Sequence, residues 1–276
     1  TKGRQKIMQK SNFHTHSVYS DGKNTIREMV EEAIGRGFTA LGMSDHSYAA
    51  KESIYCMSPE GEQAEFEEVR ALAEEYKDRI RLYAGIELDG ESLVPRRDYD
   101  YLLCSVHEIV RKGISLPIDH SEEAFVNMVN THFHGDMVEL AKVYFFNLVE
   151  HVARNRTDII GHFDLITKYS LIPEENEAYR AVAREAIHEI VKHCNTFELN
   201  TGAIARGLRV VPYPADFMVD EIKKVGGRIL IASDCHYKEK LTVWFDEGEK
   251  FLAAHGFVKN EHADLNDRVK DIEIWS

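Results

Sequence analysis

The sequence predicts an α/β protein in which about seven strand–helix units build one largely parallel sheet that closes into a barrel. Amphipathic helical patterns alternate with short apolar runs along the 276 residues. These runs are apolar at consecutive positions, which is typical of parallel strands buried on both faces. Most of the runs end in histidine or a carboxylate. The carboxyl ends of barrel strands share one rim, and active sites are built on that rim.

Helices are expected where apolar residues recur at every third or fourth position. The first such segment, 25–36, is followed by Gly37, a residue type that commonly ends helices. The clearest 3.6-residue period belongs to 174–193, whose apolar face contains Ala178, Val182, Ala186, Ile187, Ile190 and Val191. The expected helices cover 25–36, 60–77, 174–193, a segment ending near 226–227, and 238–255, and a longer helical insertion covers 121–155.

Strands are expected in the short apolar runs between these helices. A short first strand leads to His14-Thr15-His16, and the later strands cover 38–44, 81–86, 101–106, 158–161, 196–200 and 228–233. No linker, repeat or low-complexity tract divides the pattern, so the sequence predicts one domain over 1–276, with a helix and tail at 238–276. The aromatic residues of the 121–155 insertion either form a lid or pack in the core, and we favour the core.

The overall composition narrows the possible functions. With 43% hydrophobic residues and a mean hydropathy of −0.37, we expect a soluble protein with a substantial core. No apolar run is long enough to cross a bilayer, which favours a cytoplasmic protein without a membrane partner. The net charge of −13 argues against a long nucleic acid as partner. The four cysteines lie far apart and predict neither a disulfide framework nor a zinc ribbon.

Residues with metal-binding side chains cluster at the expected strand ends. They are His14, His16, His46, Glu87, His107, His162, Asp234 and His236, with Asp21 in the first loop. Nitrogen and carboxylate ligands without thiolates suit Zn²⁺, Mn²⁺ or Fe²⁺, and this set is too large for a single ion. Any one of these histidines alone would more often be a structural residue. Their repetition at one strand end after another predicts several ions on the rim, bridged by a carboxylate such as Glu87 or Asp234.

The other histidines lie in predicted helices or loops and lack this pattern, so we exclude them as ligands. His120 follows a strand end by a longer loop. It either lines the pocket or makes a loop hydrogen bond.

The motifs at the strand ends resemble those of the PHP (polymerase and histidinol phosphatase) family. They are His14-Thr15-His16-Ser17 with Ser20-Asp21-Gly22, Ser44-Asp45-His46, Gly85-Ile86-Glu87, Val106-His107, Gly161-His162-Phe163-Asp164 and Ser233-Asp234-Cys235-His236. The resemblance extends from about residue 13 to residue 236 and implies a distorted seven-stranded (β/α)7 barrel with a trinuclear metal centre at the C-terminal rim. Softer motifs such as Pro117-Ile118-Asp119-His120-Ser121 and Glu198-Leu199-Asn200-Thr201-Gly202 are similar to the branch of the family that hydrolyses L-histidinol phosphate in histidine biosynthesis.

The resemblance also implies how the ligands are shared among three divalent ions. One ion would be held by His14, His16, Glu87 and Asp234, a second by Glu87, His107 and His162, and a third by Asp21, His46 and His236.

Hydrolysis of a phosphate monoester requires a nucleophile and neutralisation of phosphoryl charge. We expect a hydroxide that bridges two ions, because metal binding lowers the pKa of water from about 15.7 to about 7. Arg206 is the best candidate for binding the phosphate, because a guanidinium matches phosphate geometry. Arg209 and Lys168 are weaker candidates. Asp164 either protonates the leaving alkoxide or orients His162.

Several assignments stay open at this level. Asp45 could be catalytic or structural, and we favour the structural role. A substrate amine could meet Asp119 or Glu198. The first hypothesis is a phosphatase acting on a small phosphate monoester, L-histidinol phosphate. The alternatives are a PHP phosphoesterase for nucleotides or oligonucleotides and a non-catalytic metal-binding PHP module, and the oligomeric state is left open.

Overall fold

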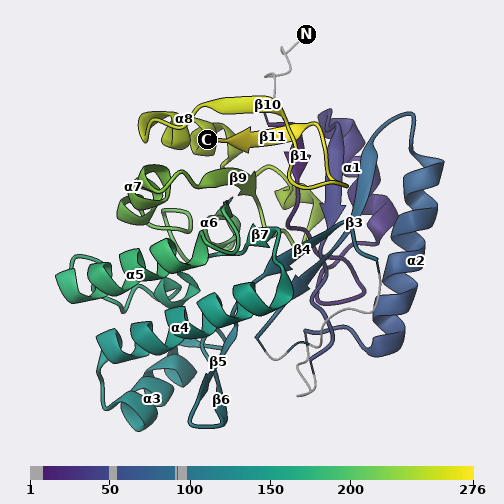
Figure 1. The fold of residues 1–276 in the computed structure, drawn as a ribbon. Helices are drawn as coiled ribbons and strands as arrows, with labels where there is room; N and C mark the ends of the chain where they lie inside the picture. The colour runs from purple at the N-terminus through teal and green to yellow at the C-terminus, as the bar shows by residue number, and fades with distance from the viewer. Residues whose placement is uncertain (1–8, 50–54, 91, 93–97) are drawn as a thin grey trace.

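The computed structural model describes residues 9–49, 55–90, 92 and 98–276 (Figure 1). A sheet of nine strands runs in the order β1-β2-β3-β4-β7-β8-β9-β11-β10. The strands in that order are β1 (Ser11–Asn12), β2 (Ala40–Met43), β3 (Arg81–Leu88), β4 (Tyr101–Cys104), β7 (Ile159–Ile160), β8 (Thr196–Asn200), β9 (Arg228–Ala232), β11 (Ile272–Trp275) and β10 (Lys259–Ala263). Neighbouring strands from β1 to β9 pair in parallel, whereas β11 pairs antiparallel with both β9 and β10.

The sheet curls so that its first and last parallel strands approach each other. Thr15, after β1, forms a parallel bridge with Cys235, after β9, and the His16 amide donates to the Cys235 carbonyl at 3.0 Å. Near the start of β1, the Lys10 amide donates to Glu273 of β11 at 2.7 Å. The predicted α/β class with a curled, mainly parallel sheet is therefore confirmed.

The helices cover the outside of the sheet. They are α1 (Ile26–Arg36), α2 (Pro59–Glu75), α3 (Glu122–Phe133), α4 (Met137–Asn155), α5 (Glu177–Ile190), α6 (Gly202–Ala205), α7 (Asp216–Lys224) and α8 (Phe245–Ala254), with 3₁₀ turns η1 (Leu165–Thr167) and η2 (Lys238–Lys240). Helix α1 ends as predicted, because Gly37 adopts a left-handed φ of 85°. In the described part of the chain, none of these helices is long and apolar enough to span a membrane.

The C-terminal part contains the predicted helix in shortened form, as α8, and two strands that were not predicted. The helix expected over 238–255 is interrupted, because Trp244 has a left-handed φ of 64° and separates the turn η2 from helix α8. The expected tail forms two strands, β10 and β11, which join the sheet. β10 escaped detection because its residues are mostly exposed and polar and follow no apolar pattern.

The segment between β4 and the insertion expected at 121–155 contains a hairpin that was not predicted. A hairpin of β5 (Glu108–Arg111) and β6 (Ile114–Pro117) precedes α3, with Lys112 and Gly113 both at positive φ in its two-residue turn. Figure 1 shows this hairpin and α3 at the opposite end of the molecule from β10 and β11. Core packing of the insertion is confirmed for most of its aromatic residues, because Phe125, Phe133, Tyr144 and Phe145 are buried while Phe146 is 60% exposed.

Tyr101 fills the space enclosed by the curled sheet just below the predicted metal ligands. Its hydroxyl lies 2.9 Å from the carbonyl of Phe13 and 3.2 Å from that of Met43. Its ring requires glycine on two neighbouring strands. A Cβ atom at Gly85 would lie 2.1 Å from the tyrosine ring, and one at Gly42 would lie 2.3 Å from the hydroxyl. Since Phe13 directly precedes His14, this packing fixes the backbone that carries the first predicted ligand.

Candidate metal centre

The structure brings all nine predicted ligand residues together at the carboxyl ends of the parallel strands. The two histidines of His14-Thr15-His16 follow β1, and single histidines follow β2, β4 and β7 at positions 46, 107 and 162. Asp234 and His236 follow β9. Glu87 differs from the expectation, because it lies inside β3 rather than after the end of the strand. Strand order and the curl of the sheet therefore bring together side chains that are far apart in the sequence.

Glu87 lies at the centre of the cluster and is only 1% exposed. Its Oε2 atom lies 3.2 Å from His14 Nε2, 3.6 Å from His16 Nε2 and 3.0 Å from His46 Nδ1. Its Oε1 atom lies 3.3 Å from His162 Nε2 and 3.8 Å from His107 Nε2. Both oxygens of one carboxylate thus lie close to histidine rings, as expected for a ligand that bridges cations.

A second carboxylate, Asp234, faces the same cluster from β9. Its Oδ1 atom lies 3.2 Å from His16 Nε2 and 3.6 Å from His14 Nε2. The Asp234 backbone has a φ of 47°, a left-handed value that aspartate tolerates better than most residues. Asp234 and Glu87 therefore both face the two N-terminal histidines.

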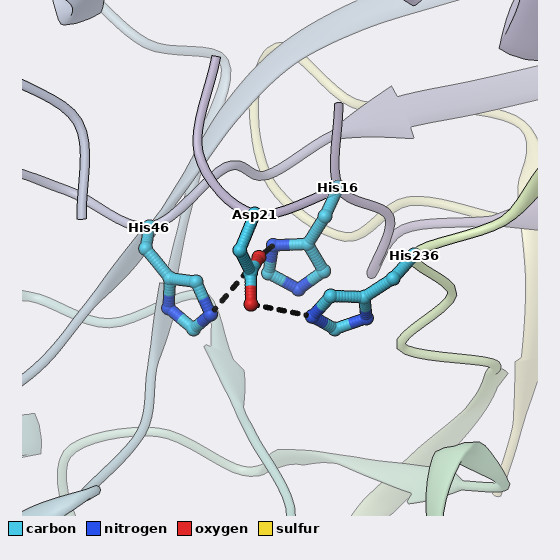
Figure 2. Close-up of side chains that lie close together, drawn as sticks. All are labelled: His16, Asp21, His46 and His236. Atoms are coloured by element: carbon cyan, nitrogen blue, oxygen red, sulfur yellow. Dashed lines mark hydrogen bonds and ion pairs between the residues drawn. The ribbon is translucent and has the colours of Figure 1, made fainter. Parts of the chain in front are cut away.

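Asp21 gathers a further group of ligands nearer the surface. Figure 2 shows its carboxylate between the rings of His16, His46 and His236. Its Oδ2 atom lies 3.1 Å from His236 Nε2, and its Oδ1 atom lies 3.8 Å from His46 Nε2 and 3.9 Å from His16 Nδ1. The Asp21 side chain is 31% exposed, so this group lies on the solvent side of the cluster.

The polar atoms at the centre of the cluster are buried without hydrogen-bond partners. They are His14 Nε2, both ring nitrogens of His16 and both carboxylate oxygens of Glu87. Burying polar groups without partners costs free energy unless a ligand pairs with them. A divalent cation is such a ligand, because it accepts both imidazole nitrogen and carboxylate oxygen. The residues present therefore fit a metal centre.

Three overlapping sets of atoms lie close enough to hold an ion. They are His16 with Asp21, His46 and His236; His14 with His16 and Glu87; and His46 with Glu87 and His107. The sets share His16, His46 and Glu87, so geometry alone does not divide the ligands as the family resemblance does. The division of ligands among three ions stays a prediction.

The charges of the cluster depend on one another. Burial alone would lower the pKa of His14, but Glu198, Glu87 and Asp234 raise it well above its ordinary value. Burial opposes ionisation of Glu87, yet His14, His46 and His107 hold its pKa well below the usual range. His16 differs, because burial and the neighbouring His236 and His46 lower its pKa to about 3. His16 is therefore neutral near pH 7, the form in which imidazole binds metals.

Two carboxylates behind the cluster orient its histidines. Glu198 accepts from His14 Nδ1 at 2.8 Å and from the His162 amide at 2.5 Å. Asp89 accepts from His107 Nδ1 at 2.9 Å and from the His107 amide at 3.2 Å. Because Nδ1 of each ring is used in this way, Nε2 is left to face Glu87.

These orienting residues were missed or assigned differently from the sequence. We considered Glu198 for a substrate amine, whereas the structure buries it completely against His14. A signal was present, since β8 is the one predicted strand whose end carries none of the predicted ligands. Asp45 has the favoured structural role, because it accepts from the Ser17 amide at 2.7 Å and from the Ser20 hydroxyl at 2.5 Å and so holds the loop that carries Asp21.

Arg206 is the predicted phosphate-binding residue that the structure places against the cluster. Its Nη2 atom donates to Asp234 Oδ2 at 3.0 Å, and its side chain remains 37% exposed. Gly202 makes this approach possible, because a Cβ atom there would lie 2.8 Å from Asp234 Oδ2 and 3.1 Å from Arg206 Nη2. A guanidinium beside a metal-binding carboxylate is positioned for an anionic ligand.

The other predicted substrate contacts are already engaged or point elsewhere. Arg209 is 7% exposed and donates to the Thr167 carbonyl at 2.7 Å and to Glu174 at 3.1 Å. Lys168 donates to the Asp119 carbonyl at 2.9 Å. His120 is exposed on the loop after β6. Their contact with a substrate stays a prediction.

Asp164, the predicted proton donor, is fully buried. Its Oδ2 atom accepts from the Ala215 amide at 3.3 Å, whereas Oδ1 lacks a hydrogen-bond partner. Burial raises the pKa of Asp164 to about 7, although the Arg209 charge opposes the shift. Both roles considered from the sequence remain compatible with this geometry.

A family model described as the PHP domain matches residues 12–202, which is more than half of the chain. The chain belongs to the PHP family. Among curated PHP relatives, the histidinol-phosphatase of Lactococcus lactis is 22% identical over 267 residues, covering 91% of this chain and 93% of the relative. The histidinol-phosphatase of Bacillus subtilis is 22% identical over 256 residues, covering 83% and 94% respectively.

The PHP fold is also found by comparison with solved structures. The histidinol phosphate phosphatase of Lactococcus lactis, complexed with zinc, L-histidinol and phosphate, superposes with a TM-score of 0.69 at 19% identity. The superposition covers 91% of this chain and 95% of the other. At this identity the likeness establishes the fold.

Proposed function

We propose that this protein is a metal-dependent phosphomonoesterase that hydrolyses L-histidinol phosphate to L-histidinol and phosphate. The observation that carries the proposal is the set of buried ligand atoms without hydrogen-bond partners around Glu87 in a PHP-family chain. The proposed substrate is supported by the relative from Lactococcus lactis, which bears the name histidinol-phosphatase and aligns over 91% of this chain. This makes the protein a phosphoric monoester hydrolase.

We further propose that the centre holds three divalent ions, Zn²⁺, Mn²⁺ or Fe²⁺, with the ligands divided as the family resemblance implies. The number of ligands supports more than one ion, because a catalytic zinc ion takes about three protein ligands and nine residues converge here. In this proposal the curled sheet is a distorted seven-stranded barrel, its active site lies at the C-terminal rim, and the chain is one PHP domain.

When bound, divalent ions lower the pKa of coordinated water and neutralise phosphoryl charge. The chain's own residues prepare the site for that chemistry. Glu198 and Asp89 hold the Nδ1 atoms of His14 and His107, so that the opposite nitrogens face the centre. Arg206 would bind phosphate oxygens, because its exposed guanidinium contacts Asp234 at the edge of the cluster.

The leaving alkoxide requires a proton, and Asp164 is the candidate donor. A pKa of about 7 leaves part of the Asp164 population protonated at neutral pH. Asp164 follows His162 by two residues, and its side chain accepts from the Ala215 amide and the Thr167 hydroxyl.

The test is phosphate release from L-histidinol phosphate, compared with p-nitrophenyl phosphate and AMP, by protein loaded with Mn²⁺, Zn²⁺ or Fe²⁺. The proposal predicts a strong preference for L-histidinol phosphate and loss of activity with a chelator. The AMP arm tests the nucleotide alternative. Poor cleavage of every substrate by fully metal-loaded protein would contradict the proposal and favour a non-catalytic metal-binding module.

A further inference from the structure

The β5–β6 hairpin returns the chain to the metal centre and places Asp119 beside it. β5 begins at Glu108, directly after the predicted ligand His107, and β6 ends at Pro117, which pairs with Glu108. The Ile118 amide then donates to the His107 carbonyl at 2.9 Å. Asp119 is the next residue, so the hairpin holds it close to the backbone of a predicted ligand.

The segment that follows β7 holds Asp119 from the other side. Lys168 Nζ donates to the Asp119 carbonyl at 2.9 Å, and the Tyr169 hydroxyl donates to the same carbonyl at 2.7 Å. The Lys168 ammonium is farther from the carboxylate, at 3.4 Å from Oδ2. These contacts fix mainly the backbone. Among the described residues, Asp119 Oδ1 has no hydrogen-bond partner, and the side chain is 24% exposed.

Asp119 therefore lies at the junction of two segments that carry predicted ligands. On one side, the Ile118 amide is hydrogen-bonded to the His107 carbonyl. On the other side, Lys168 and Tyr169 belong to the segment that follows His162.

Other acidic side chains near the centre already have partners within the protein. The loop that carries Asp21 is held by Asp45. His107 is held by Asp89, and His14 is held by Glu198. Each of these three carboxylates is at most 6% exposed. Asp164 is fully buried. Among these described residues, Asp119 combines partial exposure with an unpartnered carboxylate oxygen.

We propose that Asp119 binds the ammonium group of the substrate, so that the site selects phosphate monoesters of cationic amino alcohols. This inference rests on the proposed function and names the residue that recognises the alcohol part. In L-histidinol phosphate the amine lies one carbon from the ester-bearing carbon, close enough to reach a carboxylate next to the phosphate site. An α-amino group has an ordinary pKa of about 8, so it is largely protonated at pH 7.

The test compares Asp119→Asn with wild type on L-histidinol phosphate and on p-nitrophenyl phosphate, which has no amine. Asparagine keeps the shape of the side chain and removes only its charge. Loss of a charge-assisted hydrogen bond is expected to raise the KM for L-histidinol phosphate about 10- to 100-fold. The kinetic constants for p-nitrophenyl phosphate should change little. Glu123→Gln, which removes an exposed carboxylate on α3, is the matched control and should leave both substrates unaffected.

Binding of the product gives a readout that does not depend on catalysis. Isothermal titration calorimetry should show weaker binding of L-histidinol to Asp119→Asn by a similar factor, with unchanged metal content. Asp119→Glu, which restores the charge, should recover part of the affinity.

Two results would overturn the inference. An equal loss on both substrates would mean that Asp119 only positions His107, and unchanged constants on both would mean that it does not contact the amine. Failure of the proposed function looks different, because wild-type protein would then show no preference for L-histidinol phosphate over the aryl ester.

Discussion

Carboxylates at the two ends of the parallel strands differ in their hydrogen bonds. At the amino ends, three carboxylates accept hydrogen bonds from neighbouring strands or loops. Asp158 accepts from the Leu102 amide at 2.9 Å, Asp100 accepts from the Ala84 amide at 2.8 Å, and Glu273 accepts from the Ser11 hydroxyl at 2.6 Å. At the carboxyl ends, both ring nitrogens of His16 and both carboxylate oxygens of Glu87 are buried without hydrogen-bond partners.

This difference separates residues that stabilise the fold from residues that are kept for a ligand. A satisfied polar group contributes to stability, whereas a buried group without a partner costs free energy in the metal-free protein. Natural proteins break such local rules mainly at functional sites. Substitutions at the two ends should therefore have different consequences.

The largest effect is expected from Glu87→Gln. The amide keeps the volume of the side chain but removes the negative charge that faces five histidines. We expect loss of bound metal. We also expect kcat/KM to fall by more than about 100-fold, because replacing a residue that only orients a metal ligand already costs about 10- to 100-fold. Metal analysis by mass spectrometry and phosphate release measure both quantities. A Glu87→Gln protein with full metal content and activity would contradict the central role of this carboxylate.

A smaller loss is expected from Glu198→Gln, because Glu198 acts through the histidines that it orients. The amide would place an N–H group against either His14 Nδ1 or the His162 amide. We expect metal affinity or kcat/KM to fall about 10- to 100-fold. Glu185→Gln, at an exposed position of α5, serves as the control. Equal behaviour of the two variants would exclude an orienting role for Glu198.

The stability of the metal-free protein should depend on pH through His107. Despite burial, Asp89 and its neighbours raise the pKa of His107 from its ordinary value of 6.5 to about 10. The protonated ring thus contributes stability below about pH 6.5, and this contribution is lost as the pH rises towards 10. Calorimetry with a chelator should show a Tm that falls over this range.

Metal-loaded protein should behave differently over the same pH range, because metal and proton compete for His107. Its apparent metal affinity should rise with pH. Asp89→Asn removes the main partner of the ring and should flatten the pH dependence of the metal-free protein. A metal-free Tm that rises from pH 6.5 to 9 would show that other groups control the stability.

The smallest effect on the site is expected from Glu273→Gln at the amino ends of the strands. Glu273 accepts from the Lys10 amide and the Ser11 hydroxyl, and a glutamine cannot accept from both through its two terminal atoms. We expect the free energy of unfolding to fall by about 1–3 kcal/mol, with kcat/KM and metal content unchanged. Denaturant unfolding compares the variant with Glu261→Gln, an exposed position on β10. Loss of metal from Glu273→Gln would erase the contrast between the two ends.

Most of the helices, the parallel strands and the set of candidate ligands could be predicted, because they depend on local patterns. Apolar runs such as 228–233 mark buried strands, and the polar residues that follow them share one edge of a parallel sheet. The β5–β6 hairpin was missed because each of its strands has only 4 residues, and β10 was missed because its residues are mostly polar and exposed. The role of Asp89 could not be predicted from neighbouring residues in the sequence, because it depends on a hydrogen bond to His107, 18 residues away.

The sequence by itself determined the α/β class and the residues available to bind metal, because strand periodicity and residue chemistry are properties of short segments. Only the tertiary structure decided that Glu87 faces five histidines, that Glu198 orients His14 rather than facing a substrate, and that Asp119 lies beside His107. These relations depend on strand order and on the curl of the sheet. They join segments that are separated in the sequence, by as many as 184 residues for His14 and Glu198, so that only packing and hydrogen-bond geometry select the partners.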